Sequence, residues 1–181
     1  MKWFKNLTIR SKLLLVFGVL CVLLVGLSAL AYQTLAAIQQ NERDNVDQIA
    51  LMTRTGVEIR AHQNRIRGEM LLFLVTDNPN EKSTIRREIE DRSTKVHEGI
   101  GQVKDYWTAR HDVTGLVLIS EVEKELAGYR EGREEQFKLV EAGKADKARL
   151  LGTGSQAERF ESVRAVMLKI DRSYAVELVT L

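Results

Sequence analysis

Arginine and amide side chains gather on one face of a helical stretch in the first half of the chain. Arg60, Asn64 and Arg67 follow one another at steps of four and three residues, so they share one face over about two turns of an α-helix. Guanidinium groups bind carboxylates through paired hydrogen bonds. This face therefore predicts a site for a small anion. The other interpretation is a solvated surface, on which the arginines pair with Glu58 and Glu69 for about 0–1 kcal/mol per pair.

The other reactive residue types lack the spacing of a catalytic or metal site. The three histidines, His62, His97 and His111, fall on three different predicted segments, and no His-x-x-x-His or Glu-x-x-His pair occurs. Cys21 is the single cysteine, which excludes a disulfide and a cysteine-ligated zinc site. No serine or threonine has a neighbouring base, and no glycine-rich loop follows a strand pattern. We therefore expect no enzyme activity, no metal and no cofactor.

The composition favours a helical protein. The 181 residues include one proline and 6% aromatic residues, while 44% are hydrophobic. These proportions argue against a β-sandwich and against a disordered chain. Four of the basic residues precede Leu13 and residues 13–32 carry no charge, so residues 33–181 are slightly acidic. Such a surface is a poor binder of nucleic acid, and we expect no nucleic-acid partner.

The run from residue 13 to residue 32 is long enough to cross a membrane. Its twenty uncharged residues, at about 1.5 Å each, span roughly 30 Å of hydrocarbon. The basic residues stand before it, so the positive-inside rule keeps residues 1–12 in the cytoplasm and exports residues 33–181. The alternative is a cleaved signal peptide, because Ala29-Leu30-Ala31 resembles a processing site. Both interpretations place the body of the protein outside the cytoplasm.

Hydrophobic residues at steps of three and four predict four helices after this run. Their approximate ranges are 33–75, 81–107, 115–142 and 145–181. Short links between them favour an all-α, up-down-up-down antiparallel four-helix bundle that continues from the transmembrane helix. Gly128 and Gly132, four residues apart, indicate close helix packing. The fourth helix points back toward the bilayer, so we expect the chain to be truncated before a second transmembrane helix; a complete single-pass protein is the alternative.

The bundle topology extends the predicted ligand site onto the fourth helix. If Leu35 and Leu181 are opposite each other at the base, equal rises along the two helices put Gln156 level with Arg60. Arg159 then lies about one turn closer to the membrane. The predicted anion site comprises Arg60, Asn64, Arg67, Gln156 and Arg159.

Three stretches of the sequence are similar to parts of one protein family. Residues 6–17 (NLTIRSKLLLVF), 57–67 (VEIRAHQNRIR) and 141–148 (EAGKADKA) resemble bacterial methyl-accepting chemotaxis receptors. They correspond in turn to the entry into the first membrane helix, the first helix of the periplasmic four-helix-bundle sensor domain, and the turn between its third and fourth helices. The resemblance implies a sensor in the bacterial inner membrane that passes signals by ligand-biased helix movement. The same module also occurs on histidine kinases and cyclic-dinucleotide enzymes, and a single-pass bundle with a structural or interaction role stays open.

The resemblance also implies partners. We expect a parallel homodimer about the first helix, with Asn45, Ile49, Met52 and Gly56 at the interface, where a polar residue such as Asn45 can specify register. The ligand is expected to be a small anion or a periplasmic binding protein. In a full-length receptor, a HAMP linker and a cytoplasmic signalling rod would contact the chemotaxis kinase and the coupling protein, and the methylation sites would lie on that rod.

Overall fold

The chain is helical throughout the part that the structure describes. The computed structural model describes residues 8–180, although the side chains of residues 11, 12 and 177–180 fall outside that description. Its helices are α1 (Ile9–Val75), α2 (Pro79–Ala109), α3 (Val113–Glu141), α4 (Ala145–Thr153) and α5 (Ser155–Thr180). No strand occurs within residues 8–180. The predicted all-α fold is confirmed, whereas most of the predicted cytoplasmic segment, residues 1–12, lies outside the described residues.

The first of two compact units comprises residues 1–47 and contains the apolar run. Helix α1 is continuous through this run, and the leucines, valines and phenylalanine of the run are exposed, with Leu13 at 67% and Phe17 at 66%. An apolar surface of this extent is expected to be covered by lipid or by another protein. By length and composition, α1 is the one helix among the described residues that is apolar enough to cross a membrane.

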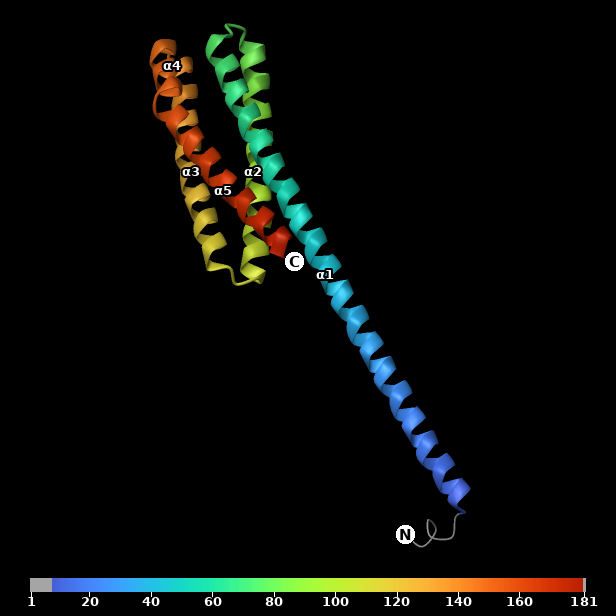
Figure 1. Cartoon of the computed structure of the whole chain (residues 1–181). Coiled ribbons are helices and arrows are strands. Elements are labelled where there is room, and N and C mark those ends of the chain that lie inside the picture. Colours follow the sequence, from blue (N-terminus) through green and yellow to red (C-terminus); the bar gives the residue numbers. More distant parts are fainter. Residues whose placement is uncertain (1–7, 181) are drawn as a thin grey trace. The chain divides into compact units, whose positions relative to one another are not determined.

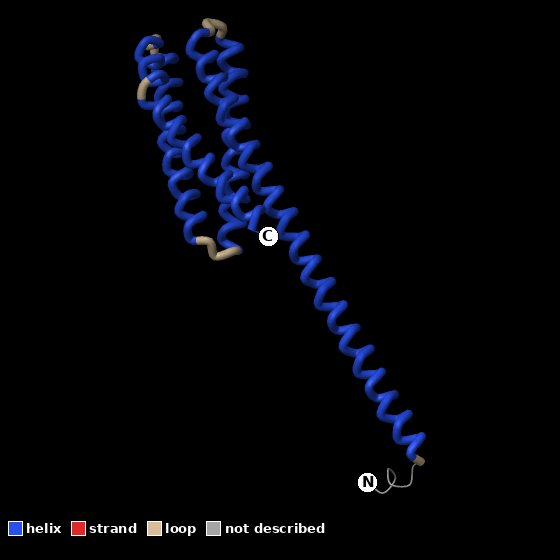
Figure 2. Tube along the Cα trace, in the orientation of Figure 1, coloured by secondary structure: helices blue, strands red, loops and turns tan. Residues whose placement is uncertain are grey.

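The second unit, residues 48–181, is a helical bundle. Within it, α2 returns antiparallel beside the C-terminal part of α1, and α3 and α5 complete the bundle (Figures 1 and 2). The core is made of side chains that recur at helical spacing on every long helix. Representative fully buried residues are Ile59, Ile66, Ile89, Ile100, Ile119, Met167 and Ile170.

Side-chain caps set the starts of α2 and α3. The Asn78 side chain accepts a hydrogen bond from the Asn80 backbone N–H at 3.0 Å, and Pro79 occupies the first turn of α2. In the same way, Asp112 accepts from the Gly115 N–H at 3.0 Å. Both helices begin two residues before the predicted starts, because these caps satisfy backbone donors ahead of the hydrophobic pattern.

The fourth predicted helix consists of two helices. A break at Gly154 separates α4 from α5, within the Gly152–Ser155 stretch where glycine weakens the helical pattern. Helix α4 packs on α3. Gly152, near the end of α4, lies against Leu74, the penultimate residue of α1, so α5 begins near the level of the α1 C-terminus.

The register predicted between the first and fourth helices is wrong. Arg60 is paired with Asp171 rather than level with Gln156, a displacement of about four helical turns. The prediction placed Leu181 opposite Leu35 at the base of the bundle, but side-chain packing along α1 and α5 sets the register.

Candidate functional site

Arg60 of α1 forms an ion pair with Asp171 of α5. Its Nη2 atom lies 2.8 Å from Asp171 Oδ2, and both side chains are largely buried. Asp171 is held close to α1 because Gly56 has no side chain; a Cβ there would lie 2.6 Å from Asp171 Oδ1. Burial raises the pKa of Asp171 above its ordinary value of 3.8, and Arg60 partly offsets that rise. The anion that Arg60 holds is therefore part of the protein.

Arg67 also has its partners on α5. Its Nη1 atom lies 3.3 Å from Glu161 Oε1, and its guanidinium carbon lies 4.4 Å from the centre of the Phe160 ring. Asn64 is exposed, and with Arg60 it lines a cavity of about 300 Å³ between α1 and α5. Arg60 and Arg67, the two α1 arginines of the predicted anion site, are thus each paired with a carboxylate of α5.

Gln156 and Arg159 connect α5 to α3. Gln156 Nε2 donates a hydrogen bond to the Tyr129 carbonyl at 3.2 Å, and Arg159 Nη1 donates to the Gly128 carbonyl. A Cβ at Gly132 would overlap the Gln156 amide, and one at Gly128 would lie 2.6 Å from Arg159 Nη1. These two glycines therefore let the polar side chains reach the α3 backbone.

The five residues of the predicted anion site do not form one cluster. Two form the α1–α5 ion pairs, two donate hydrogen bonds from α5 to α3, and Asn64 is exposed beside the α1–α5 cavity. Arg67 and Gln156 do line one cavity of about 170 Å³. In the sequence, the spacing of Gly128 and Gly132 indicated close helix packing, and the structure shows that Gln156 and Arg159 pack there.

The residues predicted for a dimer interface lie mostly inside one chain. Ile49 and Met52 belong to the hydrophobic core of the bundle, and Gly56 is buried against Asp171. Asn45 is exposed in the first unit. Three of the four residues are thus covered without a second copy, and the homodimer stays a prediction.

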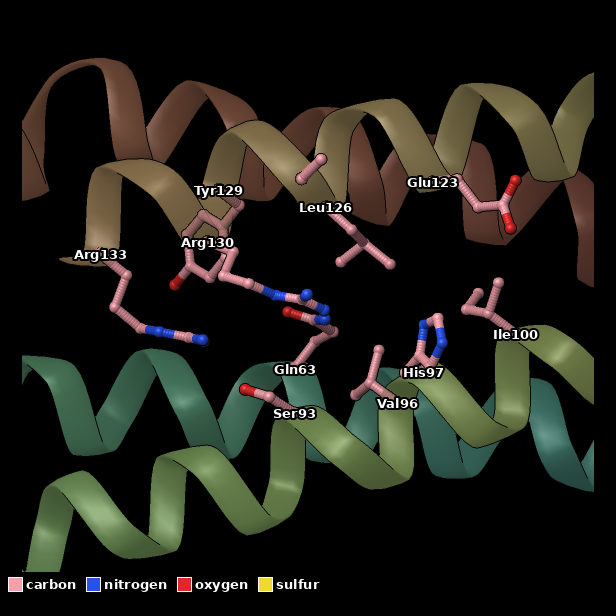
Figure 3. Close-up of a pocket in the computed structure, with 11 residues that line it drawn as sticks. Gln63, Ser93, Val96, His97, Ile100, Glu123, Leu126, Tyr129, Arg130 and Arg133 are labelled. Atoms are coloured by element: carbon pink, nitrogen blue, oxygen red, sulfur yellow. The ribbon is translucent and has the colours of Figure 1, made fainter.

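A different cavity, of about 230 Å³, opens between α2 and α3 (Figure 3). Gln63 of α1 reaches into it, and α3 contributes Tyr129, Arg130 and Arg133. Its remaining lining residues come from α2 and α3 and are Ser93, Val96, His97, Ile100, Glu123, Leu126 and Ala127. The cavity therefore has arginine and amide groups together with an apolar wall.

Arg133 is a buried cation without a carboxylate partner in the described part of the chain. Its side chain is 5% exposed, and its Nε atom has no hydrogen-bond acceptor there. The Oε1 atom of Gln63, on a residue that is 7% exposed, also has no hydrogen-bond partner. Burial lowers the pKa of Arg133 and raises that of Tyr129. Unpaired buried polar groups are unfavourable, so the Arg133 Nε–H favours a ligand that supplies an acceptor, whereas Gln63 Oε1 would need a donor.

The carboxylates around this cavity already have cationic partners. Glu123 accepts from Lys104 Nζ at 2.9 Å, and Glu134 lies 3.4 Å from Arg86 Nη2. Glu90 is also paired with Arg86, at 3.5 Å. Arg86 is shared among Glu90, Glu134 and Glu141. Glu134 and Glu90 also attract Arg133 from a distance, but within the described residues no carboxylate is paired with Arg133 itself. In the sequence, its position within the hydrophobic pattern of α3 was the signal.

The bundle thus has a cavity lined in part by polar side chains and an α1–α5 interface with two ion pairs. Within the described residues, no group of three or more His, Cys, Asp or Glu side chains is placed to hold a metal ion. A family model described as a four helix bundle sensory module for signal transduction matches residues 6–172. No curated protein matches the chain, and no solved structure matches it.

Proposed function

Because the chain belongs to the family of four-helix-bundle sensory modules for signal transduction, we propose that it is the sensor segment of a bacterial methyl-accepting chemotaxis receptor. In this proposal, residues 13–32 of α1 anchor the protein in the inner membrane, with the N-terminus in the cytoplasm and the bundle in the periplasm. The apolar character of α1 and the basic residues before it support this orientation. The proposed role is binding and transmission without catalysis.

The observation that best supports the proposal is that α1 is one uninterrupted helix. One helix, Ile9–Val75, includes both the apolar run and the residues that face α5. A change in the α1–α5 contact therefore acts on the same helix that contains the proposed membrane span.

The proposed mechanism is displacement of α5 against α1. The interface combines apolar side chains such as Phe160 with the Arg60–Asp171 and Arg67–Glu161 ion pairs. Arginine side chains can keep such pairs through a small sliding movement, because the guanidinium group presents several donors. A ligand shifts the balance between two helix positions only by binding one of them more tightly.

The proposed partners follow from this role. They are a second copy of the chain and a small anion or a periplasmic binding protein. Through the cytoplasmic part of a full receptor, they are also the chemotaxis kinase and coupling protein. Asn45 lies in the exposed part of the first unit and remains the residue proposed for contact between copies.

The experiment that tests the receptor assignment is to sequence the native gene beyond the codon for Leu181. We expect a second apolar span, a HAMP-like linker and a long helical hairpin that couples to a kinase. A histidine-kinase or cyclase domain after the second span would contradict the chemotaxis assignment but keep the sensor. A stop codon at that point would contradict transmembrane signalling by α5.

A further inference from the structure

The cavity between α2 and α3 contains buried polar groups that the proposed helix movement does not use. Arg133 and Gln63 are more than nine-tenths buried, and each has an atom without a hydrogen-bond partner within the described chain. Both residues line the cavity, and Figure 3 shows the Gln63 amide beside the Arg130 guanidinium. The Arg133 guanidinium lies apart from that pair in the view, and all three residues line the same cavity.

A purely structural role explains Arg133 poorly. Burial of a cation costs free energy, and a carboxylate in contact offsets part of that cost. The nearby Glu123, Glu90 and Glu134 are instead paired with Lys104 or Arg86, and Glu134 and Glu90 attract Arg133 only from a distance. An arginine without such a partner lowers stability relative to an apolar residue of similar length. A bound anion would remove that penalty.

We propose that this cavity binds a small carboxylate with a short apolar chain. The carboxylate accepts hydrogen bonds from Arg133 and Arg130, whose planar guanidinium groups suit that geometry. The apolar chain lies against Val96, Ile100 and Leu126, which line the same cavity away from Arg133 (Figure 3). The volume of about 230 Å³ is below the roughly 300–1,000 Å³ of pockets for drug-sized ligands, so the ligand is small.

Gln63 connects this cavity to the α1–α5 interface. It lines the Arg133 cavity and also the cavity formed by Arg60, Asn64 and residues of α5. A carboxylate at Arg133 therefore contacts the helix along which α5 is proposed to move. This link rests on the proposed function, whereas carboxylate binding does not.

The test uses the full 181-residue chain in detergent micelles and measures binding by isothermal titration calorimetry. Butyrate is the probe, and butyramide, of nearly the same shape but uncharged, is the control. We expect butyrate to bind with one molecule per chain and butyramide not to bind. Acetate should bind about tenfold more weakly, because it lacks two methylene groups. Equal binding of acetate and butyrate would overturn the apolar part of the site, and absence of butyrate binding would overturn the proposal.

Substitution of Arg133 separates a ligand-binding role from a structural one. Arg133→Met should weaken butyrate binding at least about a hundredfold and raise the thermal midpoint of the ligand-free chain. Arg87→Met, which removes an exposed arginine of α2 outside the cavity, is the matched control and should change neither quantity. A lower midpoint for Arg133→Met with unchanged butyrate affinity would show that Arg133 is structural.

If Arg133→Met does not fold, a second variant, Arg130→Gln, still tests whether the arginines bind the carboxylate. Arg130 is exposed, so Arg130→Gln should leave the fold intact. We expect it to weaken butyrate binding about tenfold. Unchanged affinity in Arg130→Gln would exclude the proposed pair of arginines. Since these titrations measure binding alone, their failure would leave the receptor assignment standing, and failure of that assignment would leave the site standing.

Discussion

Replacement of Trp107 by alanine is expected to lower the free energy of unfolding of the bundle by about 3–5 kcal/mol. Trp107 is 1% exposed, and its ring stacks on Tyr174 of α5 with the ring centres 5.5 Å apart. Gly115 of α3 faces the same indole, because a Cβ at residue 115 would overlap its ring. The side chain thus joins α2, α3 and α5, and its loss leaves a cavity where the three helices meet.

Thermal and urea unfolding of the full chain in detergent, followed by far-UV circular dichroism, measures this effect. Leu150→Ala is the control, since Leu150 is 72% exposed and its truncation should change stability by no more than about 0.5 kcal/mol. A loss below about 1 kcal/mol for Trp107→Ala would show that the indole does not hold the three helices together.

Substitution of Gly132 by alanine is expected to lower stability by about 1–3 kcal/mol. An added methyl group would overlap the buried Gln156 amide and break its hydrogen bond to the Tyr129 carbonyl. Gln156 is 3% exposed, so its amide would have to find another partner inside the bundle. The same substitution on an open helix surface acts in the opposite direction, because alanine favours the helix.

Gly68→Ala is the matched control for that prediction. Gly68 lies within α1, and a Cβ there would have no neighbour within 4 Å. Its replacement should raise stability by up to about 1 kcal/mol. If Gly132→Ala and Gly68→Ala change the urea midpoint in the same direction, the close α3–α5 contact through Gln156 is wrong.

The fold was predictable because its determinants are local. Hydrophobic spacing identifies each helix, and the Asn78-Pro79 step marks the first turn. The glycines at 128 and 132 indicated close packing, and the structure places Gln156 and Arg159 against them. Helix starts differed by two residues, since Asn78 and Asp112 cap their helices ahead of the apolar pattern.

The site was less predictable because it depends on register between distant helices. A displacement of about four turns moved Asp171, rather than Gln156, opposite Arg60. Arg60 is therefore paired with a carboxylate of the same chain and does not present a free guanidinium group to an external anion. Arg133 escaped prediction for the same reason, because only the assembled bundle shows that the nearby carboxylates pair with Lys104 and Arg86.

Movement of α5 against α1 is tested most directly by locking the two helices together. A hybrid would join residues 1–181 to the second membrane span and cytoplasmic part of a characterised chemotaxis receptor. It would carry Cys21→Ser, Gly56→Cys and Asp171→Cys, since a Cβ at residue 56 lies 3.8 Å from Asp171 Cγ. Hybrids with either new cysteine alone are the controls.

The quantity measured is kinase activity in membranes before oxidation, after oxidation and after reduction. We predict that the disulfide changes kinase activity severalfold and that reduction restores the starting level. In both single-cysteine hybrids, oxidation and reduction should leave kinase activity at the level measured before treatment. A complete cross-link with unchanged kinase activity would contradict signalling by displacement of α5 against α1.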